Sequence, residues 1–458
     1  MPQAQTQTLA GTVDQTMPLQ PVVTTGVGQD RGIPLLINSE SREPMAFDPW
    51  NLRDDKETDS NVFGVMAKKG HGKTTLNIAI STRLGQRRAG KNSERKIRIT
   101  IDDHRRDDGT PEYEALTKWY DAEQINLAEF GLNILDPEML MTLSQQLGLL
   151  KSVLGYVFGI PRFSPIMSEA LRYGLKKVLE NYPKTADLRV MALGLRTLNS
   201  KEVARFRTES YMEAQQRHTD NPNFQAEVQR LKSGAGRFNE AGKLYRAAGK
   251  LASMIEDLLD GEYGEILGSS GSLAKRMSER VTSFDYSGLN DEQIALLQTV
   301  LWHWKTAAII NKDRRFEYDI EVHDENYMMW AFEVYANSMH RYLKQIRSRQ
   351  TVVIMSTHRP SDYETVGSTD SQQYKQAMNM LHDIAGWFIG RLDRDAAEDI
   401  GRRLRLTADE IERIQHLEVG HWAYKIGDNP IVWTELVLVE EEELMALSDS
   451  ANTSMAIK

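Results

Sequence analysis

Five short apolar runs recur along the chain, and stretches with helical periodicity separate most of them. The runs cover residues 62–66, 97–101, 320–323, 351–355 and 386–390. Near-continuous apolar runs of this length are typical of strands that are buried on both faces of a parallel sheet. Because such strands alternate with helices, the pattern predicts an α/β fold with a doubly wound, mainly parallel sheet.

The pattern changes between residues 138 and 270, where strand signals disappear and helical periodicity dominates. We interpret 138–270 as a helical insertion that divides the sheet domain into residues 31–137 and 271–440. Residues 1–30 contain few apolar positions and no sustained period, so we expect a disordered tail there. The acidic and polar residues 441–458 form a second tail. The helices predicted within the insertion cover residues 137–154, 164–181, 201–218 and 239–259.

Capping and turn signals mark several element ends. Asn290 and Gln293 form a capping-box pattern at the start of one predicted helix, and Thr407 and Glu410 form another. Two late apolar segments, separated by Gly-Asp-Asn-Pro, predict a β-hairpin. These segments are residues 422–426 and 431–438.

Composition narrows the class of protein. Of 458 residues, 40% are hydrophobic and 26% are charged, which is typical of a soluble globular protein with a sizeable core. The sequence contains no run of about 18 apolar residues and no secretory signal pattern, so it predicts no membrane-spanning helix. Cysteine is absent, which excludes disulfides and thiolate metal sites, and we expect a cytoplasmic protein. The net charge of −9 confines any DNA contact to a local patch, such as the lining of an oligomer's pore.

A glycine-rich segment directly follows the first apolar run and precedes a predicted helix over residues 74–84. Gly70 and Gly72 allow backbone amides to turn inward, where they cradle phosphate oxygens together with the helix N-terminus. Lys73 is placed to reach the β- and γ-phosphates of ATP, and Thr74 to ligate Mg²⁺. The alternative interpretation is a strand-to-helix turn that binds no ligand. The predicted nucleotide-binding residues are Ala67, Lys68, Lys69, Gly70, His71, Gly72, Lys73, Thr74 and Thr75.

Another predicted strand ends in two carboxylates, Asp324 and Glu325. We expect Asp324 to hold Mg²⁺ through water and Glu325 to act as the general base that polarises the attacking water. This strand is less apolar than usual because Asp319, Glu321 and His323 interrupt it. The alternative interpretation is a solvated strand end, or a helix N-terminus with its usual acids.

Polar residues also follow the strand at residues 351–355, and Thr357 and His358 are candidates for sensing the γ-phosphate. A strand followed by a proline-led turn is the alternative. Just before this strand, Arg347 and Arg349 are candidates for an arginine that a neighbouring subunit supplies to neutralise transition-state charge. For these two, the alternative is a solvated basic helix face. The predicted catalytic residues are therefore Lys73, Glu325, His358, Arg347 and Arg349.

The order of these motifs resembles the HerA–FtsK superfamily of ring-forming motor ATPases. Within it, the chain is most similar to the ATPase domain of the conjugation and type IV secretion ATPases. The resemblance runs from about residue 32 to 440, although the family usually has Thr-Gln where this chain has Thr357-His358. The features that carry it are residues 44–49, Asp102-Asp103, Glu112-Tyr113 with Leu116, residues 133–136, Asp324-Glu325, Thr357-His358 with Ser361-Asp362, and residues 417–421.

The resemblance implies a RecA-like P-loop fold of the ASCE class and a homohexamer with nucleotide at its subunit interfaces. It also implies that ATP hydrolysis drives the movement of DNA or protein. The implied partners are DNA or components of a secretion or packaging machinery, which would recruit the protein to a membrane or a viral complex. Two alternatives stay open, a viral genome-packaging ATPase without a nuclease domain and a nucleotide-binding scaffold that does not hydrolyse its ligand. The polar interruptions of the acidic strand keep the scaffold alternative open.

Overall fold

The chain divides into two compact units. The first is drawn from residues 1–127, 276–295 and 313–458, and the second from residues 128–275 and 296–312. The predicted tail at residues 1–30 lies outside the described residues, as does all of the predicted tail at 441–458 except Glu442. The structure is a computed structural model that describes residues 32–86, 88–89, 93–94, 97–103, 111–139, 141–206, 209, 237–269, 272–274, 279–310, 317–346, 350–363, 371–440 and 442.

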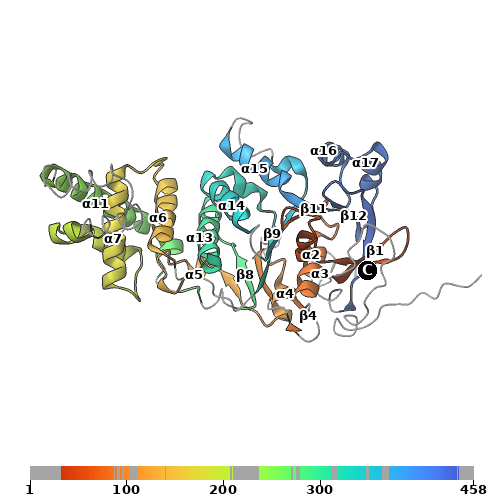
Figure 1. Cartoon of the computed structure of the whole chain (residues 1–458), viewed down its shortest axis with the longest axis horizontal. Coiled ribbons are helices and arrows are strands. Elements are labelled where there is room, and N and C mark those ends of the chain that lie inside the picture. Colours follow the sequence, from red (N-terminus) through yellow and green to blue (C-terminus); the bar gives the residue numbers. More distant parts are fainter. Residues whose placement is uncertain are drawn as a thin grey trace, which may run out of the picture. The chain divides into compact units, whose positions relative to one another are not determined.

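The first unit is built on one 11-stranded sheet (Figure 1). Its strands are β1 (Ile33–Asn38), β2 (Pro44–Phe47), β3 (Val62–Met66), β6 (Ile97–Asp103), β7 (Gln124–Asn126), β8 (Val281–Asp285), β9 (Tyr318–Asp324), β10 (Thr351–Thr357), β11 (Ile384–Ile389), β12 (His421–Ile426) and β13 (Val432–Leu436). They lie in the order β2-β1-β13-β12-β11-β3-β10-β9-β6-β8-β7. Neighbours from β11 to β7 are parallel, and the remaining neighbours are antiparallel. The predicted α/β fold with a mainly parallel sheet is therefore confirmed.

Each of the apolar runs predicted as a strand is a strand of this sheet, and the predicted hairpin is β12 with β13. The strands that the apolar pattern does not predict are β1, β2, β7 and β8. Strand β8 reads Val-Thr-Ser-Phe-Asp, and all of its residues are buried although three of them are polar. Strand β7 has only three residues, which is too short for a periodic signal. A separate two-stranded sheet joins β4 (Arg88–Ala89) to β5 (Ser93–Glu94).

Helices connect these strands. Both predicted capping boxes form, because Asn290 and Gln293 exchange side-chain-to-backbone hydrogen bonds, as do Thr407 and Glu410. Among the described residues, every helix is too short or too polar to cross a lipid bilayer. The helices are α2 (Pro49–Asp54), α3 (Lys73–Gln86), α4 (Glu114–Trp119), α5 (Leu127–Phe130), α13 (Asp291–Ile310), η3 (Asn326–Ala331), α14 (Glu333–Ile346), η4 (Pro360–Tyr363), α15 (Gln372–His382), α16 (Arg394–Leu404) and α17 (Ala408–Gln415).

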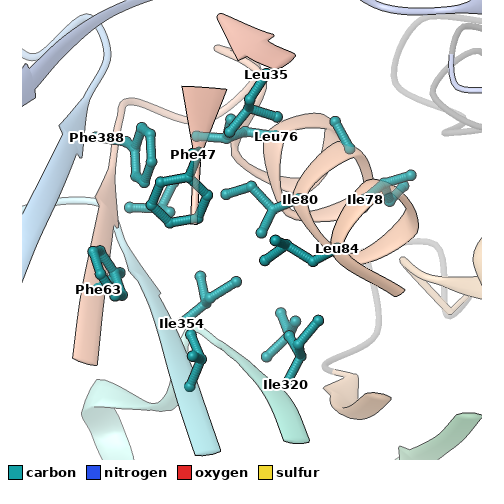
Figure 2. Close-up of a cluster of buried hydrophobic side chains, with 14 of the residues drawn as sticks. Leu35, Phe47, Phe63, Leu76, Ile78, Ile80, Leu84, Ile320, Ile354 and Phe388 are labelled. Atoms are coloured by element: carbon teal, nitrogen blue, oxygen red, sulfur yellow. The ribbon is translucent and has the colours of Figure 1, made fainter. Parts of the chain in front are cut away.

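Helix α3, which begins at Lys73, packs its apolar side against the sheet. Leu76, Ile80 and Leu84 of this helix belong to one buried cluster, which also contains Phe47 and Ile354 from the strands (Figure 2). Full burial of a leucine, isoleucine or phenylalanine side chain contributes about 1.5–3 kcal/mol. The cluster therefore fixes α3 against the sheet, and with it the position of the predicted phosphate-binding residues at its start.

Strand β9 has two different buried faces. Ile320 and Val322 join the apolar cluster below α3, whereas Asp319, Glu321 and His323 point to the other face because successive side chains of a strand alternate. These polar side chains are paired. Asp319 Oδ1 accepts from Arg98 Nε over 2.6 Å, Glu321 Oε1 accepts from the Tyr342 hydroxyl over 2.5 Å, and His323 pairs with Asp102. The polar residues that interrupt the strand in the sequence are therefore paired: Glu321 and His323 are buried, and the half-buried Asp319 is held by Arg98.

The second unit is helical. It contains η1 (Pro137–Met139), α6 (Leu143–Val157), α7 (Pro165–Asn181), α8 (Leu188–Arg196), α11 (Arg237–Asp260), α12 (Gly264–Leu267) and the part of α13 from residue 296 on. Helices α7 and α8 pack closely, since a Cβ added at Gly174 of α7 would lie 2.5 Å from Leu195 of α8. Helix α11 contacts both of them, and Figure 1 shows α7 and α11 side by side.

Three helical segments of this unit are compared with the prediction. The helix predicted to begin at residue 137 begins at Leu143 instead, because Thr142 and Gln145 form a capping box there and residues 137–139 form a 3-10 turn. The pattern does not predict α8, whose nine residues form a helix capped by Asp187. Of the helix predicted over 201–218, residues 201–206 and 209 are helical and the others lie outside the described residues.

Candidate functional site

The predicted phosphate loop connects β3 to α3. Its two glycines have left-handed backbone angles, with φ of 78° at Gly70 and 90° at Gly72. A Cβ added at Gly70 would meet nothing within 4 Å, and one added at Gly72 would meet only Trp422, at 3.7 Å. Both positions therefore require glycine for backbone conformation and not for space. The open surroundings of Gly70 leave room beside the loop for a ligand.

The start of the loop is closely packed. Ala67 is fully buried, and a Cβ added at Gly390 would lie 2.8 Å from the Cβ of Ala67. This contact explains why a small side chain occupies the first loop position. Lys68 and Lys69 are exposed, and the ring of the half-buried His71 lies 3.2 Å from the Lys69 carbonyl oxygen.

Lys73 lies among three partners. Its buried Nζ is 3.4 Å from the Ala67 carbonyl oxygen, 3.0 Å from Nδ1 of His358 and 4.0 Å from Oε1 of Glu325. An ammonium group carries three donors and no acceptor. The lysine is therefore held at the loop by one carbonyl group and one imidazole, beside the carboxylate that we predict to be the general base.

His358 connects that lysine to Glu325. Its Nε2 is 2.5 Å from Oε1 of Glu325. Because Lys73 can only donate, Nδ1 of His358 accepts from it, and the ring proton lies on Nε2 and is donated to Glu325. Glu325 itself has a left-handed backbone, with φ of 49°, and its N–H donates to the Ser356 carbonyl oxygen over 3.2 Å.

The two residues predicted to hold Mg²⁺ also have defined partners. The Thr74 hydroxyl donates to Oε2 of Glu112 over 2.9 Å, and Oδ2 of Asp324 accepts from the Tyr113 hydroxyl over 3.0 Å. Asp324 is 2% exposed. Within the part of the chain that the structure describes, its second oxygen, Oδ1, has no hydrogen-bond partner.

These donors fit a magnesium ion. Mg²⁺ prefers oxygen ligands and is usually held by one or two protein groups together with phosphate oxygens and water. A threonine hydroxyl and a buried carboxylate oxygen without a partner suit that chemistry. Among the described residues no group of three or more His, Asp or Glu side chains could form a metal site by itself, so phosphate and water would have to complete the coordination.

Asp103, Glu112 and Tyr113 belong to the site although the predicted site residues do not include them. The carboxylate of Asp103 accepts from the backbone N–H groups of Glu112 and Tyr113 over 2.9 and 3.2 Å. Burial raises the pKa of Asp103 to about 7, although these hydrogen bonds act in the opposite direction. Burial and the nearby Asp324 carboxylate raise the pKa of Tyr113 well above its ordinary value, so its hydroxyl keeps its hydrogen. Their only sequence signals are the Asp102-Asp103 and Glu112-Tyr113 pairs within the family resemblance.

The remaining candidates differ in their placement. The Thr357 hydroxyl donates to Oδ2 of Asp362 over 3.0 Å and so belongs to the turn after β10. Of the two sensor candidates, His358 is therefore the one that contacts Lys73. Thr75 lies in the first turn of α3. Arg347 and Arg349 lie outside the described residues.

Comparison with known proteins identifies the fold. No family model and no curated protein matches the chain, but solved structures do. A structure of VirB4 of Thermoanaerobacter pseudethanolicus covers 92% of this chain and 100% of its own, with 14% identity and a TM-score of 0.61. The plasmid coupling protein TrwB in complex with ADP and Mg²⁺ covers 92% of this chain and 93% of its own, with 13% identity and a TM-score of 0.51. At the level of the fold, the predicted resemblance is confirmed, and the chain has the P-loop ATPase fold of VirB4 and TrwB.

Proposed function

We propose that this chain is a Mg²⁺-dependent ATPase. One observation carries the proposal: the loop after β3, which turns at two glycines, holds Lys73 4.0 Å from Glu325, the residue that directly follows β9. Binding of ADP and Mg²⁺ by TrwB, which has the same fold, supports the choice of ligand. The polar residues of β9 are paired with other side chains, and Glu321 and His323 are also buried, so they no longer favour a scaffold that binds nucleotide without hydrolysing it.

The chemistry follows from the side chains. Loop amides and the Lys73 ammonium group bind the phosphates of ATP. Glu325 takes the proton of the attacking water as general base, and the N–H of His358 orients its carboxylate. Bound Mg²⁺, held by Thr74 and Asp324, would neutralise charge that develops on the phosphate oxygens.

Substitution of Lys73 and Glu325 tests the ATPase. Lys73→Ala should abolish turnover and weaken ATP binding, whereas Glu325→Gln should retain bound ATP and slow turnover by about 10²–10⁴-fold, the range for losing a general base. Lys344→Ala and Glu398→Gln, which change exposed helix residues of the same unit, should turn over at the wild-type rate. Unchanged phosphate release by Lys73→Ala and Glu325→Gln, measured with purified protein, would remove the proposal.

We further propose that hydrolysis drives the movement of DNA or protein through a homohexameric ring. The likeness to VirB4 and to a plasmid coupling protein supports this class of work. In such a ring, Arg347 or Arg349 of one subunit reaches the nucleotide of the next. Mixing Lys73→Ala subunits with Arg347→Ala/Arg349→Ala subunits should then restore part of the activity, because some interfaces recover an intact loop and an intact arginine. No recovery in mixtures that light scattering shows to be oligomeric would contradict the shared site.

A further inference from the structure

Two adjacent residues contact both groups that are proposed to hold the metal. Glu112 accepts the hydrogen of the Thr74 hydroxyl over 2.9 Å, and the hydroxyl of Tyr113 donates to Asp324 over 3.0 Å. Thr74 lies at the start of α3 and Asp324 at the end of β9, so they come from elements far apart in the sequence. The Glu112-Tyr113 pair is thus a bridge between the two.

Hydrogen bonds with other buried residues hold this bridge in place. Both of its backbone N–H groups donate to the buried carboxylate of Asp103, which also accepts from Gln124 Nε2 over 3.1 Å. The side chain of Asn77 donates to the Tyr113 oxygen over 2.8 Å. Tyr113 is fully buried. These contacts fix the backbone of both residues and the side chain of Tyr113.

The direction of each hydrogen bond has a chemical consequence. Because the Thr74 hydrogen points to Glu112, the lone pairs of its oxygen are left for a cation. Because Asn77 donates to the Tyr113 oxygen, the phenol hydrogen is directed to Oδ2 of Asp324. That bond orients the carboxylate and leaves Oδ1, which has no partner among the described residues, as the oxygen available to a ligand.

We propose that Glu112 and Tyr113 are positioning residues that set the affinity of this site for Mg²⁺. The inference rests on the proposed function, since it concerns the metal that accompanies the nucleotide. Hydrogen-bond partners that orient metal ligands typically change metal affinity by about 10–100-fold when they are removed. Neither residue needs to contact the ion or the phosphate, so the nucleotide should still bind when Mg²⁺ is abundant.

The test measures the binding of a fluorescent ADP analogue to the full chain over a range of free Mg²⁺ concentrations, with EDTA as the zero point. Tyr113→Phe and Glu112→Ala should each raise the Mg²⁺ concentration for half-maximal binding by about 10–100-fold, with similar binding at saturating Mg²⁺. Glu112→Gln keeps an acceptor oxygen for Thr74 and should recover much of the loss. Tyr120→Phe is the matched control, because this hydroxyl contacts the backbone of α3 at Thr82 and should leave the Mg²⁺ dependence unchanged.

Three results would overturn the inference. The first is a wild-type Mg²⁺ dependence in both Tyr113→Phe and Glu112→Ala. The second is an equal loss of binding at every Mg²⁺ concentration, including EDTA, which indicates a general structural role. Both leave the proposed ATPase intact. If the wild-type chain binds no nucleotide at any Mg²⁺ concentration, the proposed function fails, and this inference fails with it.

Discussion

The guanidinium group of Arg83 joins the far end of α3 to the C-terminal part of the first unit. Its Nε and Nη2 donate to the two oxygens of Glu442 over 2.8 and 2.6 Å. It also donates to the carbonyl oxygens of Pro34, over 2.6 Å, and of Val437. Arg83 is 9% exposed and Glu442 1%. Replacement of Arg83 by methionine should therefore leave the buried Glu442 carboxylate without its ion-pair partner and remove the donor of three carbonyl groups, those of Pro34, Leu35 and Val437.

The size of the effect depends on which partner is lost. Breaking a buried ion pair from one side costs about 3–5 kcal/mol because the other charge stays buried without its partner, so this loss is expected for Arg83→Met. Glu442→Gln keeps one acceptor oxygen and leaves the guanidinium with its carbonyl acceptors, so we expect about 1–3 kcal/mol. Arg83→Met/Glu442→Leu removes both charges, and its loss should be smaller than that of Arg83→Met alone.

Urea unfolding of the variants measures these differences in the free energy of unfolding. Arg413→Met is the matched control, because Arg413 and Glu40 form an exposed pair at 2.9 Å and exposed pairs contribute about 0–1 kcal/mol. The reasoning is refuted if Arg83→Met is no more destabilising than Glu442→Gln, or if the double variant loses the sum of the two single losses. Since α3 begins ten residues before Arg83, ATP affinity of the folded variants should be unchanged.

Other predictions follow from single contacts. Gly64→Ala should destabilise the first unit by about 1–3 kcal/mol, seen as a lower melting temperature, because the added Cβ would overlap the buried ring of Trp387. Burial raises the pKa of Asp103 from 3.8 to about 7, so its contribution to stability is complete below pH 4 and is lost as the pH rises through about 7. Asp103→Asn should flatten this part of the curve of unfolding free energy against pH; an unchanged slope would contradict the assignment. Thr407→Ala removes the side-chain cap of α17 and should lower the free energy of unfolding, measured by urea denaturation, by about 1 kcal/mol. The remaining half of the capping box, Glu410, should not make up this loss.

Local sequence patterns are sufficient to predict much of the fold. The central strands are predicted because residues buried on both faces form continuous apolar runs, as at residues 62–66 and 351–355. Gly70 and Gly72 are predictable because a left-handed backbone almost requires glycine. Strand β8 escapes prediction because three of its five residues are polar although all are buried, and no local pattern records that it lies between β6 and β7 in the sheet.

The predicted site residues lack Glu112 and Tyr113 for a similar reason. Glu112 and Tyr113 act on Thr74 and Asp324, which lie 38 and 211 positions away in the sequence. Only the order of strands in the sheet brings these positions together. The position of His358 after an apolar strand predicts it as a sensor candidate. Its two hydrogen bonds, however, depend on the side chains of Lys73 and Glu325. Pairings of this kind follow from tertiary packing and leave no spacing rule in the sequence.

The polar face of β9 also disfavours pairing of this strand in a wrong register. Apolar strands can align two residues out of place and still bury the same faces. In this sheet, Arg98 lies opposite Asp319 and Asp102 lies opposite His323, so any such slip would separate the partners of both pairs. A two-residue slip would also carry Asp324 about 7 Å along the strand, away from the loop that it serves. These side-chain pairs therefore favour one register of β6 against β9. The same register places the carboxylates at the end of β9 where they can act.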